Sequence, residues 1–208
     1  MIFNLVAIAA VVALTFVKVF PFSSQLFAAL GAMAIGIYRS DGRVQRWFRI
    51  DHDWRSMIAW GVVGGLAVIA ADAALYSIYP LLGIAPAKLD RFASVRGNLF
   101  ELLEWLALIW TIVALTEELI SRAFLIDQWT DLLPAGRVAS ALAVVFSSMT
   151  FSALHVYQGM AGAISNFVAG VILGVIYLQR GRTLGSNVIA HAIADSLGLV
   201  AIFLGLAA

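Results

Sequence analysis

The sequence predicts an all-α protein, a polytopic membrane helical bundle of about seven transmembrane helices. The chain has 208 residues, of which 62% are hydrophobic and only 12% charged, whereas soluble domains carry roughly 25% charged residues. Seven apolar stretches approach the length of about 20 residues that a spanning helix needs. Because a helix satisfies its own backbone polar groups in lipid, one integral-membrane domain over residues 1–208 is expected.

Prolines and a helix-start signal separate the predicted spans. Pro21 divides the first two stretches, Pro80 ends the third, and Pro134 precedes the fifth. Asn98, followed three residues later by Glu101, resembles the capping box that begins a helix. The seven predicted spans are about 2–20, 22–38, 57–81, 99–126, 138–157, 160–179 and 183–206.

Small residues recur within these spans at helical spacing. Gly61 with Gly65, and Gly170 with Gly174, are four residues apart and therefore share a helix face. Such pairs allow two helices to approach closely. We expect them to mark packing inside the bundle.

Basic residues predict how the chain is oriented. The longest polar stretch, RSDGRVQRWFRIDHDWR over 39–55, holds five arginines, and the positive-inside tendency places it in the cytoplasm. Trp47 and Trp54 are expected to anchor this loop at the membrane interface. The loop is either a solvated connector or a segment that lies on anionic lipid. A multi-pass protein of the plasma membrane is expected.

Composition also excludes several functions. A net charge of +1, with no basic cluster interleaved with aromatics, argues against a nucleic-acid partner. The chain has no cysteine, which excludes disulfides, thiol nucleophiles and thiolate metal sites.

Ionisable residues inside spans are costly and call for an explanation. The stretch ALTEELISRAFL carries Glu117, Glu118 and Arg122. Glu118 and Arg122 are four residues apart with the acid first, the favourable arrangement for an ion pair. Successive helical residues differ by about 100° in direction, so Glu117 and Glu118 are not expected to face the same partner. Glu117 is left without a local basic neighbour, which suits a general base.

Two further motifs place histidines in apolar helices. Phe151 and His155 share a face of the fifth span, and His191 and Asp195 share a face of the last one. A carboxylate at that spacing can hold an imidazole in one tautomer. A lone histidine of this kind is commonly a hydrogen-bond partner between helices, but three motifs in order on three helices favour catalysis.

The three motifs resemble a known family. EExxxR, then FxxxH, then HxxxN/D is the signature of the CAAX protease and bacteriocin-processing family, and this chain has EELISR, FSALH and HAIAD, with the catalytic core within about 99–206. The resemblance implies a glutamate-type intramembrane endopeptidase, whose CAAX members cleave behind a prenylated cysteine. It implies that Glu117 and His155 activate water, and that His191 and Asp195 serve the oxyanion. Support of the site would fall to Glu118, Arg122 and Phe151.

One position departs from the CAAX members, which carry asparagine where this chain has Asp195. An ionised aspartate cannot donate a hydrogen bond to an oxyanion. Asp195 is therefore expected either to orient His191 as a charged donor or to stay protonated.

The chemistry leaves some alternatives open. Other intramembrane protease signatures (HExxH, GxSG, GxGD) do not occur, and a carboxylate with two histidines can hydrolyse a peptide without a cofactor. A zinc ion held by Glu117, His155 and His191 is the alternative. The expected partner is a membrane-associated protein or peptide, with or without a lipid. The rival functions are a non-proteolytic bacteriocin immunity or toxin-binding protein, and a proton-coupled carrier.

Overall fold

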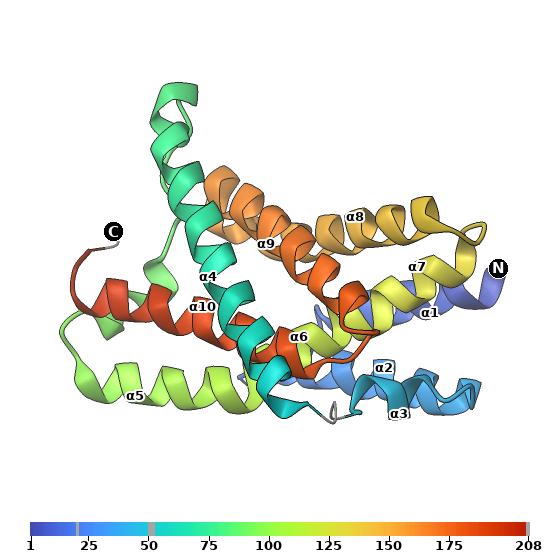
Figure 1. Ribbon diagram of the computed structural model, residues 1–208. Helices are drawn as coiled ribbons and strands as arrows, with labels where there is room; N and C mark the ends of the chain where they lie inside the picture. Colours follow the sequence, from blue (N-terminus) through green and yellow to red (C-terminus); the bar gives the residue numbers. More distant parts are fainter. Residues whose placement is uncertain (20, 50–52, 207–208) are drawn as a thin grey trace.

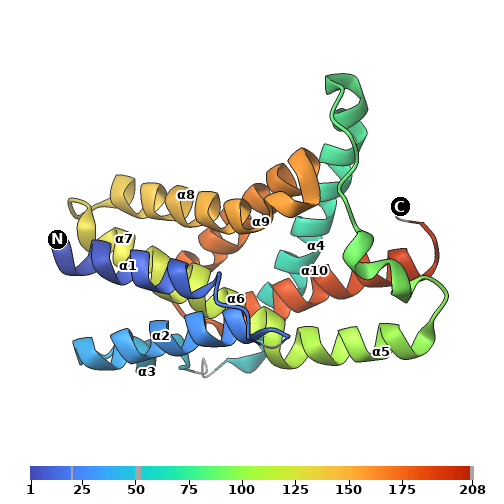
Figure 2. The ribbon, with the colours of Figure 1, turned by 180° about the vertical axis from the view of Figure 1, so that it is seen from behind.

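The predicted all-α fold class is confirmed. A computed structural model describes residues 1–19, 21–49 and 53–206 of the chain, and within those ranges every regular element is helical. The two termini lie at opposite ends of the molecule, as the front and back views show (Figures 1 and 2). The long α-helices are α1 (Ile2–Leu14), α2 (Ser23–Arg39), α4 (Trp54–Ile78), α5 (Leu99–Leu108), α8 (Arg137–Leu154), α9 (Gly159–Gln179) and α10 (Gly185–Phe203).

Shorter elements join these helices. Three are α-helical: α3 (Arg43–Trp47), α6 (Ala114–Glu118) and α7 (Asp127–Leu132). Two are π-helical, η3 (Ile109–Val113) and η4 (Leu119–Ile126). Three are 3₁₀ turns, η1 (Tyr79–Leu82), η2 (Asp90–Val95) and η5 (Val156–Gln158).

Five helical segments are long and apolar enough to cross a membrane. They are Trp54–Leu82, Leu99–Leu132, Arg137–Leu154, Val156–Gln179 and Gly185–Phe203, and they correspond to the last five predicted spans. The first two stretches form shorter helices than predicted. α1 has 13 residues and α2 has 17, which at 1.5 Å per residue reach only about 20 Å and 26 Å against a hydrocarbon core of about 30 Å. The polytopic character is confirmed, and the count of seven stays a prediction.

Side-chain caps fix where two of the spans begin. The Asn98 side chain accepts hydrogen bonds from the backbone N–H groups of Phe100 (3.1 Å) and Glu101 (3.3 Å), so the predicted start of the fourth span is confirmed. The Glu101 carboxylate accepts from the Ser94 hydroxyl. Asp53 caps α4 by accepting from the backbone N–H of Ser56.

Glycines allow α4 to lie directly against α10, which it crosses in Figure 1. A Cβ atom added at Gly61 would lie 2.5 Å from Cγ2 of Ile189, and one at Gly65 would lie 2.8 Å from Cγ2 of Ile193. Side chains never come that close, so only glycine permits this contact. At Gly170 and Gly174 the added Cβ would meet α8 at 2.9 Å and 2.7 Å. All four glycines therefore pack inside the bundle, as predicted.

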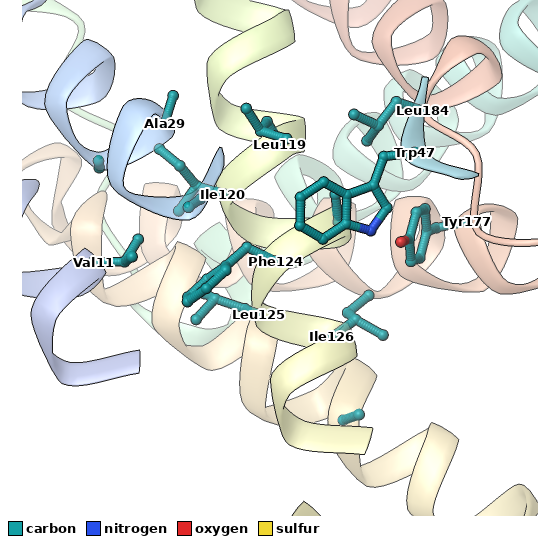
Figure 3. Close-up of a cluster of buried hydrophobic side chains, with 14 of the residues drawn as sticks. Val11, Ala29, Trp47, Leu119, Ile120, Phe124, Leu125, Ile126, Tyr177 and Leu184 are labelled. Carbon is teal, nitrogen blue, oxygen red and sulfur yellow. The ribbon is translucent and has the colours of Figure 1, made fainter. Parts of the chain in front are cut away.

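Trp47 belongs to the core, and its prediction as an interfacial anchor was wrong. Its side chain is completely buried and lies beside Tyr177 and Leu184, with Phe124 nearby (Figure 3). The burial arises because α3 folds back onto the protein. The backbone carbonyl of Trp47 accepts from the N–H of Leu184 at 2.9 Å. Trp54, by contrast, is 56% exposed, in keeping with an anchor.

A buried carboxylate holds α3 in place. Asp127 is 2% exposed and accepts from the Trp47 indole Nε1 (2.8 Å), from Arg46 (2.5 Å) and from Arg182 (2.7 Å). These donors come from α3, before the third span, and from the turn between α9 and α10. Asp127 thus joins the N-terminal part of the chain to its C-terminal part.

The described part of the polar loop packs against the rest of the protein. Residues 50–52 of the predicted 39–55 loop lie outside the described ranges. Arg39 and Arg43 pair with Asp131 on α7 at 3.0 Å and 2.9 Å. Arg43 also donates to Asp41, and these hydrogen bonds hold the pKa of the Asp41 carboxyl well below its usual value. Residues 39–49 are thus tied to the protein by these arginines, while Gln45, Phe48 and Arg49 stay exposed. The choice between a solvated connector and a segment that lies on anionic lipid stays a prediction.

Candidate active site

The helix that carries the two glutamates is irregular on both sides of them. From Leu99 to Leu132 it runs without a break, but Ala114–Glu118 is a short α-helical segment between the π-helical segments η3 and η4. A π turn inserts an extra residue and therefore rotates the side chains that follow, and such turns are frequent at functional sites. The direction in which each glutamate points is set by these turns.

Glu118 is fully buried and has three partners. Its Oε1 lies 2.7 Å from Nδ1 of His191 and 3.2 Å from Nη1 of Arg122, and its Oε2 accepts from Nδ2 of Asn187 at 3.2 Å. The predicted Glu118–Arg122 pair is therefore present. Arg122 Nη1 makes no hydrogen bond at that distance, so the contact depends on charge rather than on a directed bond.

His191 lies between three carboxylates. Its Nδ1 contacts Glu118, while its Nε2 is 3.4 Å from Oδ2 of Asp195 and 3.7 Å from Oε2 of Glu117. The expectation that Glu117 and Glu118 cannot face one partner was thus wrong. An imidazole has nitrogens on two edges, and α10 brings the ring against the helix so that each edge meets a different glutamate.

Phe151 connects the second motif to the other two. Its ring centroid is 4.6 Å from that of His155 and 6.2 Å from that of His191, and the guanidinium carbon of Arg122 lies 4.6 Å above the same ring. Phe151 is 4% exposed. It therefore separates the two histidines and covers Arg122 on one side.

His155 follows the last residue of α8 and is half-buried. Its Nδ1 lies 2.8 Å from the backbone carbonyl oxygen of Phe151. Because a carbonyl only accepts, Nδ1 carries the proton, and Nε2 presents a lone pair in the neutral ring. Among the described residues, no hydrogen bond or ion pair joins His155 to Glu117.

A metal ion would need several ligands close together. Within the described ranges, no group of three or more histidine, aspartate or glutamate side chains could hold one. The alternative ligand set of Glu117, His155 and His191 is consequently not assembled in this structure.

Asn187 is the site residue that the sequence motifs did not predict. It is completely buried and donates both to Glu118 and to the backbone carbonyl of Leu173 on α9 (2.7 Å). Its position four residues before His191 was the available signal, since this spacing puts Asn187, His191 and Asp195 on one face of α10.

The three motifs meet around Phe151, whose ring lies against His155, His191 and Arg122, and each motif belongs to a helical segment long and apolar enough to cross a membrane or directly follows one. Residues 99–197 match the sequence model of a family described as Rce1-like, type II CAAX prenyl endopeptidases. The resemblance to the CAAX protease and bacteriocin-processing family is thereby confirmed over this part of the chain, and it indicates a membrane endopeptidase of the CAAX type. Comparisons with curated proteins and with solved structures find no match.

Proposed function

We propose that the protein is an intramembrane endopeptidase that hydrolyses a peptide bond in a membrane-associated protein or peptide, using a water activated by Glu117 and His155. The observation that carries this proposal is the different burial of the two glutamates. The Glu118 side chain is inaccessible and already contacts Arg122, Asn187 and His191, whereas the Glu117 side chain is 14% exposed. Only Glu117 can meet a water and a substrate, which a general base must do.

The proposed reaction begins at Glu117. Its carboxylate takes a proton from water, and the resulting hydroxide attacks the carbonyl carbon of the scissile peptide. The lone pair on Nε2 of His155 assists by orienting the water. When the tetrahedral intermediate collapses, the proton held by Glu117 passes to the leaving amine. The reaction needs no cofactor.

His191 is the residue proposed to donate a hydrogen bond to the oxyanion. Carboxylates only accept hydrogen bonds, and His191 has them beside both nitrogens. Nδ1–H of His191 donates a hydrogen bond to Glu118, which fixes the ring. The Nε2–H is then shared between Asp195 and the developing oxyanion. Removal of one such donor commonly lowers kcat by about 10²–10³.

We further propose that the site works in the plasma membrane, with the loop over 39–55 on the cytoplasmic side. The apolar faces of the five spanning segments would admit a substrate that carries a lipid, as CAAX-type substrates do.

The test is cleavage of two fluorogenic peptides by the protein reconstituted in liposomes. One peptide ends in a farnesylated CAAX sequence, and the other is identical but lacks the lipid. Glu117→Gln and His155→Gln are each expected to lower kcat/KM at least about a hundredfold. Glu104→Gln removes an exposed acid from the same long helix and should leave cleavage unchanged.

Several outcomes would contradict the proposal. If Glu117→Gln retained a third or more of the wild-type rate, Glu117 would not be the base. If the folded wild-type protein cleaved neither peptide, the non-proteolytic immunity function would be favoured instead. Cleavage of both peptides at equal rates would show that the substrate needs no lipid, and the peptidase proposal would still stand.

A further inference from the structure

A groove of about 1100 Å³ opens between α7, the turn after it, α8 and α9. It contains none of the catalytic candidates. Arg137 begins α8 and His155 follows its end, so the mouth of the groove is about 27 Å along the helix from the proposed active site. The groove is therefore separate from the peptidase centre.

The groove has an apolar wall and a polar mouth. The wall is built from aliphatic side chains of α8 and α9, namely Val144, Val145, Val171, Val175 and Leu178. The mouth carries charges and hydroxyls from α7, from the start of α8 and from the turn between α9 and α10, namely Thr130, Asp131, Arg137, Ser140 and Arg182. Such a division suits an amphiphile whose chain lies along the wall and whose head remains at the mouth.

The charge at the mouth favours an anionic head. Asp131 is already paired with Arg39 and Arg43, and Asp127, just behind the mouth, is paired with Arg46 and Arg182. The two acids are thus neutralised by four arginines. Arg137 is exposed and makes no hydrogen bond or ion pair within the described ranges. It is the cation that remains available for a ligand.

Two segments that are long and apolar enough to span a membrane have an end at the mouth. Arg137 is the first residue of one spanning segment, and Leu178 is next to the last residue of another, Val156–Gln179. Arginines at the ends of spans face the phosphates of the bilayer. We propose that this groove binds one anionic phospholipid, with its phosphate against Arg137 and one acyl chain along the valines.

The test uses native mass spectrometry of the intact protein in detergent, with equal amounts of dioleoyl-phosphatidylglycerol and dioleoyl-phosphatidylcholine added. The wild-type protein should retain phosphatidylglycerol preferentially. Arg137→Gln should lower the ratio of bound phosphatidylglycerol to phosphatidylcholine about fivefold, the factor expected from one cation at a membrane surface. Val175→Trp, which fills the apolar wall, should lower retention of both lipids.

Arg55→Gln is the matched control, because Arg55 is an exposed arginine at the start of another span, outside the groove. It should leave the lipid ratio unchanged. Equal effects of Arg55→Gln and Arg137→Gln would show that any arginine at the end of a span attracts the anionic lipid, and this would overturn the proposal. The proposal also fails if Val175→Trp, folded by size-exclusion chromatography, retains the lipid as the wild type does, or if inorganic phosphate alone displaces the phosphatidylglycerol.

Discussion

Replacing Arg122 with methionine tests the buried pair at the centre of the site. The substitution keeps a long apolar side chain but removes the charge that lies 3.2 Å from Glu118 and 4.6 Å from the Phe151 ring. Breaking a buried ion pair by removing one partner costs about 3–5 kcal/mol. We expect the free energy of unfolding to fall by about 3 kcal/mol, the lower end of this range. Asn187 and His191 still donate to Glu118, and Arg122 makes no directed hydrogen bond to it.

The assay is thermal unfolding of the purified protein in lipid nanodiscs. For a chain of this length, each kcal/mol shifts the Tm by about 2–4 °C, so Arg122→Met should lower the Tm by about 6–12 °C. The double variant Glu118→Gln/Arg122→Met leaves no unpaired charge and should recover at least half of that loss. A decrease of less than about 2 °C for the single variant would refute the reasoning. So would a double variant as unstable as the single one.

Two pairs of substitutions test the surroundings of His191. Gly61→Ala puts a methyl group 2.5 Å from Ile189 and should destabilise the protein by about 1–3 kcal/mol. Gly198→Ala is the control, because Gly198 lies on the same helix as His191 but faces open space, and this change should be neutral or stabilising by up to about 1 kcal/mol. Equal Tm values for the two variants would contradict the close contact at Gly61. Asp195→Asn keeps a hydrogen-bonding group beside Nε2 of His191 and should retain kcat/KM within about tenfold, whereas Asp195→Leu should lose at least about a hundredfold. If both Asp195 variants lost activity equally, the charge of Asp195 rather than its hydrogen bond would be what matters.

The helical architecture was predictable because it depends on local properties. Apolar length predicted the last five spans, and the cap at Asn98 fixed, to the residue, the start of the helix that carries Glu117 and Glu118. The ion pair of Glu118 with Arg122 followed from a spacing of four residues. Each of these features is determined within a few turns of one helix.

The contacts between helices were harder to predict. The π-helical segments on both sides of Ala114–Glu118 have no recognisable sequence signal, and they change the directions that a regular helix would give to the glutamates. The bridging of Glu117 and Glu118 by His191 needs the position of α10. The burial of Trp47 depends on Asp127, which is 80 residues away in the chain. Helical periodicity contains none of this long-range information.

The contacts of Asp127 bear on whether the region that carries the three motifs could fold without the rest of the chain. The family match covers only residues 99–197, yet within it Asp127 depends on Arg46 and Trp47, and α10 depends on the glycine face of α4. A fragment restricted to the matched region would keep the pairing of Asp127 with Arg182 but would lose its donors Arg46 and Trp47, and it would uncover the flank of α10 that packs on α4. The N-terminal part of the chain, which carries none of the three motifs, therefore completes the packing of the region that the family model matches.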